Sequence, residues 1–146
     1  MRTKIRAVLA LPPAERRALR QAWLYLLLVD AALRLIPLPR VQAGIASLRR
    51  ARRGGSPPLP ADRLSALLAT AARHHLHPMR CLPRALALQA LLARQGEHAE
   101  LRIGVARQAG TLQAHAWLER NGLPLGEEPG VGDLFAPLAA APAPAL

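Results

Sequence analysis

Cys81 is the only cysteine in this chain of 146 residues, and it comes directly before a segment with helical periodicity. A thiol at the N-terminus of a helix feels the positive end of the helix dipole and unpaired N–H groups, and both favour the nucleophilic thiolate. Backbone N–H groups there can also hold the oxyanion of a tetrahedral intermediate. A single cysteine is nevertheless more often a small buried apolar residue. Cys81 is therefore a candidate nucleophile whose role depends on what lies near it.

His115 is the candidate base, because it lies in an alternating segment that follows the cysteine-bearing helix. In residues 113–119, "QAHAWLE", Ala and Leu alternate with His115, Trp117 and Glu119, which predicts a strand. An imidazole on an adjacent strand can pair with the thiolate and later protonate a leaving amine, and an acid can orient that imidazole. A histidine alone is more often structural, so the joint placement of cysteine and histidine carries the hypothesis.

Which acidic residue lies beside His115 depends on the register of a predicted hairpin. Asn121-Gly122 is a strong turn signal. A two-residue turn places His115 opposite Glu128, whereas a three-residue loop with Gly122 in the left-handed conformation places His115 opposite Glu127. Both loops suit the sequence, so Glu127 and Glu128 are alternative third members of a Cys-His-acid set.

The helices and strands that must position these residues can be predicted from the spacing of apolar residues and from the places of prolines and glycines. Helices come first and strands follow, so the predicted fold class is α+β. We expect a basic helical N-terminal region (1–58), a core with the candidate residues (59–138) and a mobile tail (139–146). The predicted helices run from Pro12-Pro13 to about Leu35, from Val41 to Arg53, from Pro60 or Ala61 to His75, and from Leu82 or Pro83 to a terminal Gly96; the strands lie within 99–107, 113–119 and 123–125, the last at an edge because of Pro124.

The composition bears on the cellular compartment in which the protein works. A single cysteine cannot form an internal disulfide, so nothing requires an oxidising environment. The longest apolar run, Ala22 to Val29, stops at Asp30, well short of the roughly 18 apolar residues that indicate a membrane span. The apolar segment after the first basic residues is too short and too rich in proline for a signal peptide. We expect a soluble, cytoplasmic protein without a membrane span.

The net charge of +11 is concentrated near the N-terminus, where residues 1–60 hold twelve Lys and Arg against two acids. Such a region can attract nucleic acid, anionic lipid or an acidic protein, or can simply be a solvated surface. No recognition-helix pattern, zinc knuckle or aromatic-studded basic groove accompanies it, so we expect no nucleic-acid partner. A non-catalytic, basic interaction protein is the alternative from another functional class.

The segment Cys81-Leu-Pro-Arg84-Ala-Leu-Ala-Leu, the "LRIGV" strand and Ala114-His115-Ala116-Trp117 with Asn121-Gly122 resemble the lasso-peptide leader peptidases. These belong to the transglutaminase-like, microcin-processing group of cysteine proteases. The resemblance implies a papain/transglutaminase-like core, in which a cysteine-bearing helix packs on a small antiparallel sheet. It also implies a Cys-His-Asp triad, with Cys81 and His115 matching. Where the family has Asp, this chain has Glu127; Asp133 is a more distant alternative.

The resemblance further implies the activity and the partners. The enzyme would cut the leader from a lasso precursor peptide through an acyl-thioester, as a stand-alone type that needs a separate small leader-recognition protein and works beside an ATP-dependent macrolactam synthetase. The basic N-terminal region, with Arg49, Arg50, Arg52 and Arg53, is a candidate docking surface for these partners. No metal or organic cofactor is needed. A transglutaminase-like acyltransferase is the alternative enzyme, because it shares the acyl-thioester.

Other residues near the candidates have both a functional and a structural interpretation. Arg84 matches the family arginine and can steady the thiolate, bind a substrate carboxylate or form a surface salt bridge. Trp117 shares a strand face with His115 and can wall the site or belong to the core. His74, His75 and His77 precede Cys81, but neighbouring histidines point apart and no zinc motif accompanies them, so we expect no metal site.

Overall fold

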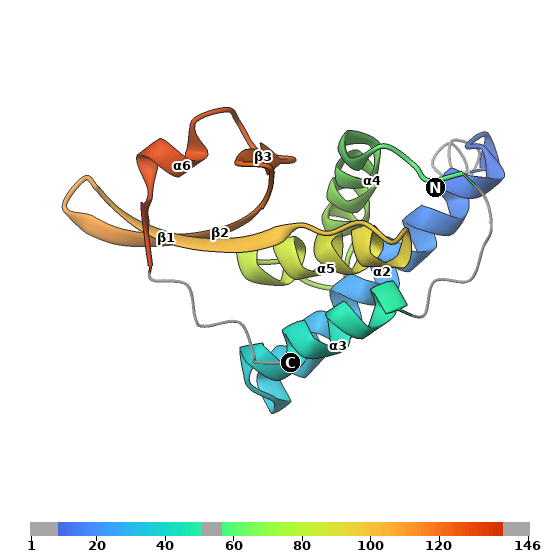
Figure 1. The fold of residues 1–146 in the computed structure, drawn as a ribbon, viewed down its shortest axis with the longest axis horizontal. Helices are drawn as coiled ribbons and strands as arrows, with labels where there is room; N and C mark the ends of the chain where they lie inside the picture. Colours follow the sequence, from blue (N-terminus) through green and yellow to red (C-terminus); the bar gives the residue numbers. More distant parts are fainter. Residues whose placement is uncertain (1–8, 51–56, 139–146) are drawn as a thin grey trace.

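The computed structural model describes residues 9–50 and 57–138. The predicted mobile tail, 139–146, lies outside the described residues, as do Arg52 and Arg53 of the basic segment. Helices come first and a small antiparallel sheet follows, so the fold is α+β, as predicted (Figure 1). The elements are α2 (Pro13–Leu35), α3 (Leu38–Arg50), α4 (Ala61–Arg73), α5 (Cys81–Arg94), β1 (Glu100–Gln108), β2 (Thr111–Arg120), β3 (Leu123–Leu125), α6 (Val131–Leu134) and β4 (Ala136–Pro137).

Helix α5 is the centre of the molecule. Helices α2, α3 and α4 and strand β2 all pack on it, and Figure 1 shows it between the other helices and the sheet. Its sequence is apolar on nearly every side, and Leu86 and Leu92 are fully buried. One cluster of buried side chains joins α5 to α2 and α4, and a second joins it to α2 and α3. The start of α5 at Cys81 is therefore fixed by the packing of the whole helical layer.

The end of α5 has the termination signal that the sequence indicates. Gly96 has a φ of 80°. The N–H of Gly96 donates to the Ala93 carbonyl and the N–H of Glu97 to the Leu92 carbonyl, at 2.9 and 3.0 Å. This pair of bonds is a Schellman motif, which needs a left-handed residue after the helix. The chain turns there and enters β1.

The sheet has the strand order β3-β2-β1-β4. Asn121 and Gly122, with φ of 52° and 74°, form the two-residue turn that pairs Arg120 with Leu123. The three-residue loop that sequence also allowed is therefore wrong. Strand β3 lies at an edge, as Pro124 predicted, because proline cannot donate a ladder hydrogen bond.

Three features differ from the sequence-based expectation. Helix α3 begins at Leu38 rather than near Val41, because Pro39 is tolerated in its first turn. Helix α6 and strand β4 were not expected. Strand β4 pairs with β1, and Leu138 N–H donates to the Ile103 carbonyl at 2.8 Å, so the chain stays paired with the sheet up to Leu138.

The N-terminal helices pack on the predicted core rather than apart from it, and the division at residue 58 stays a prediction. An ion pair joins the two regions: Arg63 on α4 donates to the Glu15 carboxylate on α2 at 2.6 and 2.8 Å. These hydrogen bonds, with the charge of Arg63, lower the pKa of Glu15 below its ordinary value. Within the described residues, no helix is long and apolar enough to cross a membrane.

Leu26→Ala tests whether α2 belongs to the same cooperative core as α5. Leu26 is fully buried, whereas Leu28, half a turn away on the same helix, is 51% exposed. Leu26→Ala should lower the free energy of unfolding by about 2–5 kcal/mol, and Leu28→Ala should change it by less than about 0.5 kcal/mol. Urea unfolding followed by circular dichroism measures both. An equal effect of the two substitutions, or a separate transition for α2, would contradict the shared core.

Arg63→Gln tests the link between α2 and α4. Without the guanidinium, the pKa of Glu15 should rise toward its ordinary value, which NMR titration of the carboxyl carbon measures. A carboxyl with a lowered pKa contributes stability above its ordinary pKa and loses it as the pH falls through the lowered value, so the variant should lose this contribution at neutral pH. Arg73→Gln, on the same helix, is the control and should leave the pKa of Glu15 unchanged.

Candidate active site

Cys81 is the first residue of α5 and is partly exposed. It lines a narrow cleft between the start of α5, helix α4 and the sheet. The N–H groups of Cys81 and Leu82 have no intrahelical acceptor, because the first N–H groups of a helix never do. Pro83 adds no N–H. The nucleophile candidate therefore lies beside two backbone donors at the positive end of the helix dipole.

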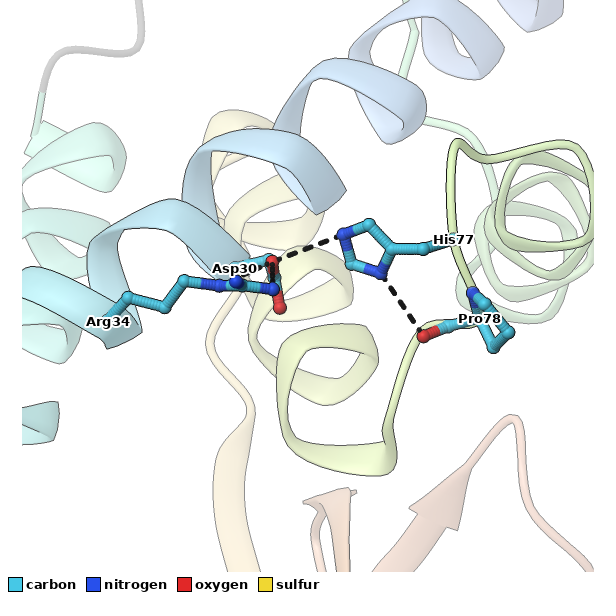
Figure 2. A network of polar contacts seen from close by, with 4 residues as sticks. All are labelled: Asp30, Arg34, His77 and Pro78. Atoms are coloured by element: carbon cyan, nitrogen blue, oxygen red, sulfur yellow. Dashed lines mark hydrogen bonds and ion pairs between the residues drawn. The ribbon is translucent and has the colours of Figure 1, made fainter.

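The loop that leads into Cys81 is tied to α2 by two contacts, one of which Figure 2 shows. His77 Nε2 lies 3.4 Å from Asp30 Oδ2, and Arg34 donates two hydrogen bonds to the same oxygen at 3.2 and 2.9 Å. The ring of His75 lies 4.8 Å from that of Trp23, centroid to centroid. These contacts between α2 and residues 75–77 restrain the segment directly before Cys81.

His115 and Glu127 line the same cleft as Cys81. His115 lies on β2, and its Nε2 is 3.2 Å from Glu127 Oε1. The side chain of His115 is 25% exposed and that of Glu127 is 35% exposed, so both can be reached from solvent. The structure thus brings together the three residues that the sequence singled out for a Cys-His-acid set.

The contact with Glu127 does not arise from the strand register that the sequence suggested. The two-residue turn is present, and continuing its register would place Glu128 opposite His115. However, β3 ends at Leu125, and Gly126 has a φ of 70°. A side chain at Gly126 would collide with the Ser65 hydroxyl on α4, so glycine lets the chain pass close to α4. The ladder is broken there, and Glu127 is the residue that returns to His115.

Two aromatic rings hold the ring of His115. The indole of Trp117 is nearly parallel to it, with centroids 5.9 Å apart and 15° between the planes, and the Phe135 centroid is 5.2 Å away. Trp117 is buried and donates from Nε1 to Glu119 Oε1 at 2.9 Å. Trp117 therefore both belongs to the core and walls the cleft, so the two interpretations of this residue are not exclusive.

Gly104 makes the position of Phe135 possible. A Cβ atom on Gly104 would lie 2.7 Å from Phe135 Cβ and 3.1 Å from Trp117 Cη2. Gly104 pairs with His115 on one side and with Pro137 of β4 on the other. Phe135 was missed from the sequence, although a glycine inside an alternating strand is a signal of close backbone approach.

A protein-family model matches most of the chain. The family model of the transglutaminase-like superfamily matches residues 7–140, a stretch that includes Cys81, His115 and Glu127. The chain belongs to the transglutaminase-like superfamily. This superfamily includes cysteine peptidases and acyltransferases, and the four-stranded antiparallel sheet behind a cysteine-bearing helix is consistent with its core. The chain matches no curated protein and no solved structure.

The other residues that the sequence suggested for the site are Arg84, Glu128 and Asp133. Arg84 is exposed and lines the cleft with Cys81, and within the described residues it forms no salt bridge. The ion pair of His115 is with Glu127; in the described part of the chain neither Glu128 nor Asp133 makes one with it. Asp133 lies on α6.

Two of the three histidines before Cys81 have structural contacts. The ring of His75 packs at a tilt of 32° against that of Trp23, and His77 pairs with Asp30. Among residues 9–50 and 57–138, no three His, Cys, Asp or Glu side chains gather closely enough to hold a metal ion. Asp30 was not singled out from the sequence for a site role, although an acid that interrupts an apolar helix is a signal of a polar contact.

Gly104→Ala tests the close packing beside His115. The added methyl group has to displace Phe135 or Trp117, so the free energy of unfolding should fall by about 1–3 kcal/mol. Gly44→Ala, in the middle of α3 with nothing within 4 Å of the new atom, should instead raise it by about 0.5–1 kcal/mol. Urea unfolding measures both changes. Equal signs would show that Phe135 does not pack where the structure places it.

Proposed function

We propose that this protein is a cysteine peptidase that removes the leader peptide from a lasso-peptide precursor. The observation that carries the proposal is the cleft that Cys81, His115 and Glu127 line together, with His115 Nε2 3.2 Å from Glu127 Oε1. Membership of the transglutaminase-like superfamily supports this chemistry. The resemblance of the segments around Cys81 and His115 to leader peptidases supports the substrate.

In the proposed reaction, Glu127 holds Nε2 of His115, so Nδ1 is the nitrogen left to exchange a proton with the thiol of Cys81. The thiolate attacks the scissile carbonyl carbon, and the N–H groups of Cys81 and Leu82 stabilise the oxyanion. The C–N bond breaks as His115 gives its proton to the leaving amine, which leaves an acyl-thioester on Cys81.

Water completes the cycle. His115 takes a proton from a water molecule, the hydroxide oxygen attacks the thioester carbon, and the C–S bond breaks to release the leader carboxylate. The leaving amine of the first step is the N-terminus of the core peptide, which becomes available for ring closure. An acyltransferase would place an amine where water attacks, and both routes share every step up to the acyl-thioester.

The partners belong to the same proposal. A separate small leader-recognition protein would hold the leader, and the ATP-dependent macrolactam synthetase would receive the freed core peptide. The excess of basic residues before residue 60 supports an acidic docking partner, because surface charge of one sign steers association with the other. The cleavage assay therefore contains the recognition protein as well as the proposed peptidase.

Cleavage of a leader-bearing precursor, followed by intact mass, tests the function. Hydrolysis gives two fragments whose masses sum to the precursor plus one water, whereas transfer to an added amine gives a leader fragment that carries that amine. Cys81→Ser should lower the rate by about 10⁴-fold or more. Cleavage that Cys81→Ser leaves intact would contradict the mechanism, and an amine-bearing product would replace the peptidase by the acyltransferase.

Glu127→Gln and Glu128→Gln form a matched pair that tests the third residue. Glu127→Gln keeps the size of the side chain but removes the negative charge that orients His115 and stabilises its protonated form. The cleavage rate should fall by about 10²–10⁴-fold. Glu128→Gln removes the same charge one residue away, where the described part of the structure has no ion pair with His115, and should leave the rate nearly unchanged. A larger loss in Glu128→Gln would assign the role to that residue.

A further inference from the structure

Cys81 has an arginine on each side of it. Arg80 directly precedes Cys81, and Arg84 follows it by one helical turn; both are exposed. Each arginine lines a hollow that Cys81 also lines: Arg84 lies in the narrow cleft with His115 and Glu127, and Arg80 lies in a groove on the other side of the cysteine. Each of the two hollows that open beside Cys81 therefore has an arginine on its wall.

The open space beside Cys81 is large enough for a peptide. The groove with Arg80 has a volume of about 660 Å³ and runs between α2 and the start of α5, with Asp30 and Arg34 on its wall. A second groove of about 600 Å³ is bounded by Arg73 and Arg84. The two grooves share His77 and Pro78. Volumes of this size are typical of ligand-binding clefts.

The charges around these two grooves are mostly positive. Of the described residues that line them, four are arginines and one, Asp30, is an acid. Asp30 already contacts Arg34 and His77 (Figure 2). Arg80 and Arg84 form no salt bridge within the described residues. The cations closest to Cys81 in the sequence are thus available to a negatively charged ligand.

We propose that Arg80 and Arg84 form a carboxylate-binding subsite beside Cys81, and that the peptide substrate carries an acidic side chain next to the bond that is cut. A guanidinium group binds a carboxylate through two parallel hydrogen bonds, which fixes the direction of the ligand as well as its charge. This inference rests on the proposed function in one respect, which is that the carboxylate bound in the natural reaction belongs to a peptide substrate.

The two arginines have an alternative role, which is to stabilise the thiolate of Cys81. The two roles differ in what they do to small reagents. Stabilising the thiolate speeds reaction with every electrophile, whereas a carboxylate subsite speeds reaction only with an electrophile that carries a carboxylate. Comparing a charged and a neutral reagent therefore separates them.

Alkylation of Cys81 by iodoacetate and by iodoacetamide makes this comparison without any peptide. In both reactions the thiolate displaces iodide and an S–C bond forms, but only iodoacetate has a carboxylate, next to the reacting carbon. The rate ratio of iodoacetate to iodoacetamide, measured by intact mass at low salt, should exceed that of glutathione by about tenfold. The excess should shrink as salt is added, because these arginines are exposed.

Arg80→Gln and Arg84→Gln should each lower this ratio at least severalfold, and the double variant should bring it to the glutathione value. Arg107→Gln removes an exposed arginine of β1 that lines neither groove and should leave the ratio unchanged. Both substitutions near Cys81 are at exposed positions, and urea unfolding verifies that each variant is folded. A wild-type ratio equal to that of glutathione, or variants in which both reagents slow equally, would overturn the subsite.

Cleavage of precursor peptides separates this inference from the proposed function. A raised alkylation ratio with no cleavage of any leader-bearing peptide would keep the subsite and overturn the peptidase. Cleavage with a ratio equal to that of glutathione would keep the peptidase and overturn the subsite. If the peptidase and the subsite are both correct, the acidic residue next to the cut bond matters only when the arginines are present. Replacing that residue by glutamine should then slow cleavage by the wild-type protein more than cleavage by the Arg80→Gln, Arg84→Gln double variant.

Discussion

Helix α5 is enclosed by other elements along most of its length, and the position of the site follows from that enclosure. Helices α2, α3 and α4 and strand β2 pack on it, and a helix that is apolar on nearly every side is stable only in such an interior. Its first turn, at Cys81, is where it meets a surface cleft. The cysteine is therefore held by the core itself rather than by a loop, which is how precise sites are usually built.

Much of the fold can be read from the sequence, because long elements carry a strong periodic signal. The helix over Pro13–Leu35 and the hairpin at Asn121-Gly122 are examples, since their prolines, apolar spacing and turn residues are local. Helix α6 and strand β4 lack such signals. Strand β4 has two residues and exists because β1 offers it an edge and Gly104 leaves room beside it. Its stability comes from contacts that are distant in sequence.

The same distinction applies to the site. Cys81 and His115 could be singled out because each depends on its own element, a helix start and a strand. The partner of His115 could not be chosen from register, because β3 stops at Leu125 and the chain turns at Gly126 against α4. The tie between Asp30 and His77 and the ring of Phe135 beside His115 depend on tertiary packing. No local pattern specifies such contacts.

The order of elements along the chain has a consequence for biosynthesis. Helix α2 is made before α4 and α5, and its inner face, where Leu26 is fully buried in the folded protein, packs on both of them. Until both α4 and α5 have left the ribosome, that face lacks part of the surface that covers it. The growing chain thus exposes the apolar face of a helix within a strongly basic segment. Exposed apolar surface of this kind is bound by chaperones or leads to premature association with other chains. The helix that begins at Cys81 is also the segment that completes the surface on which α2 packs.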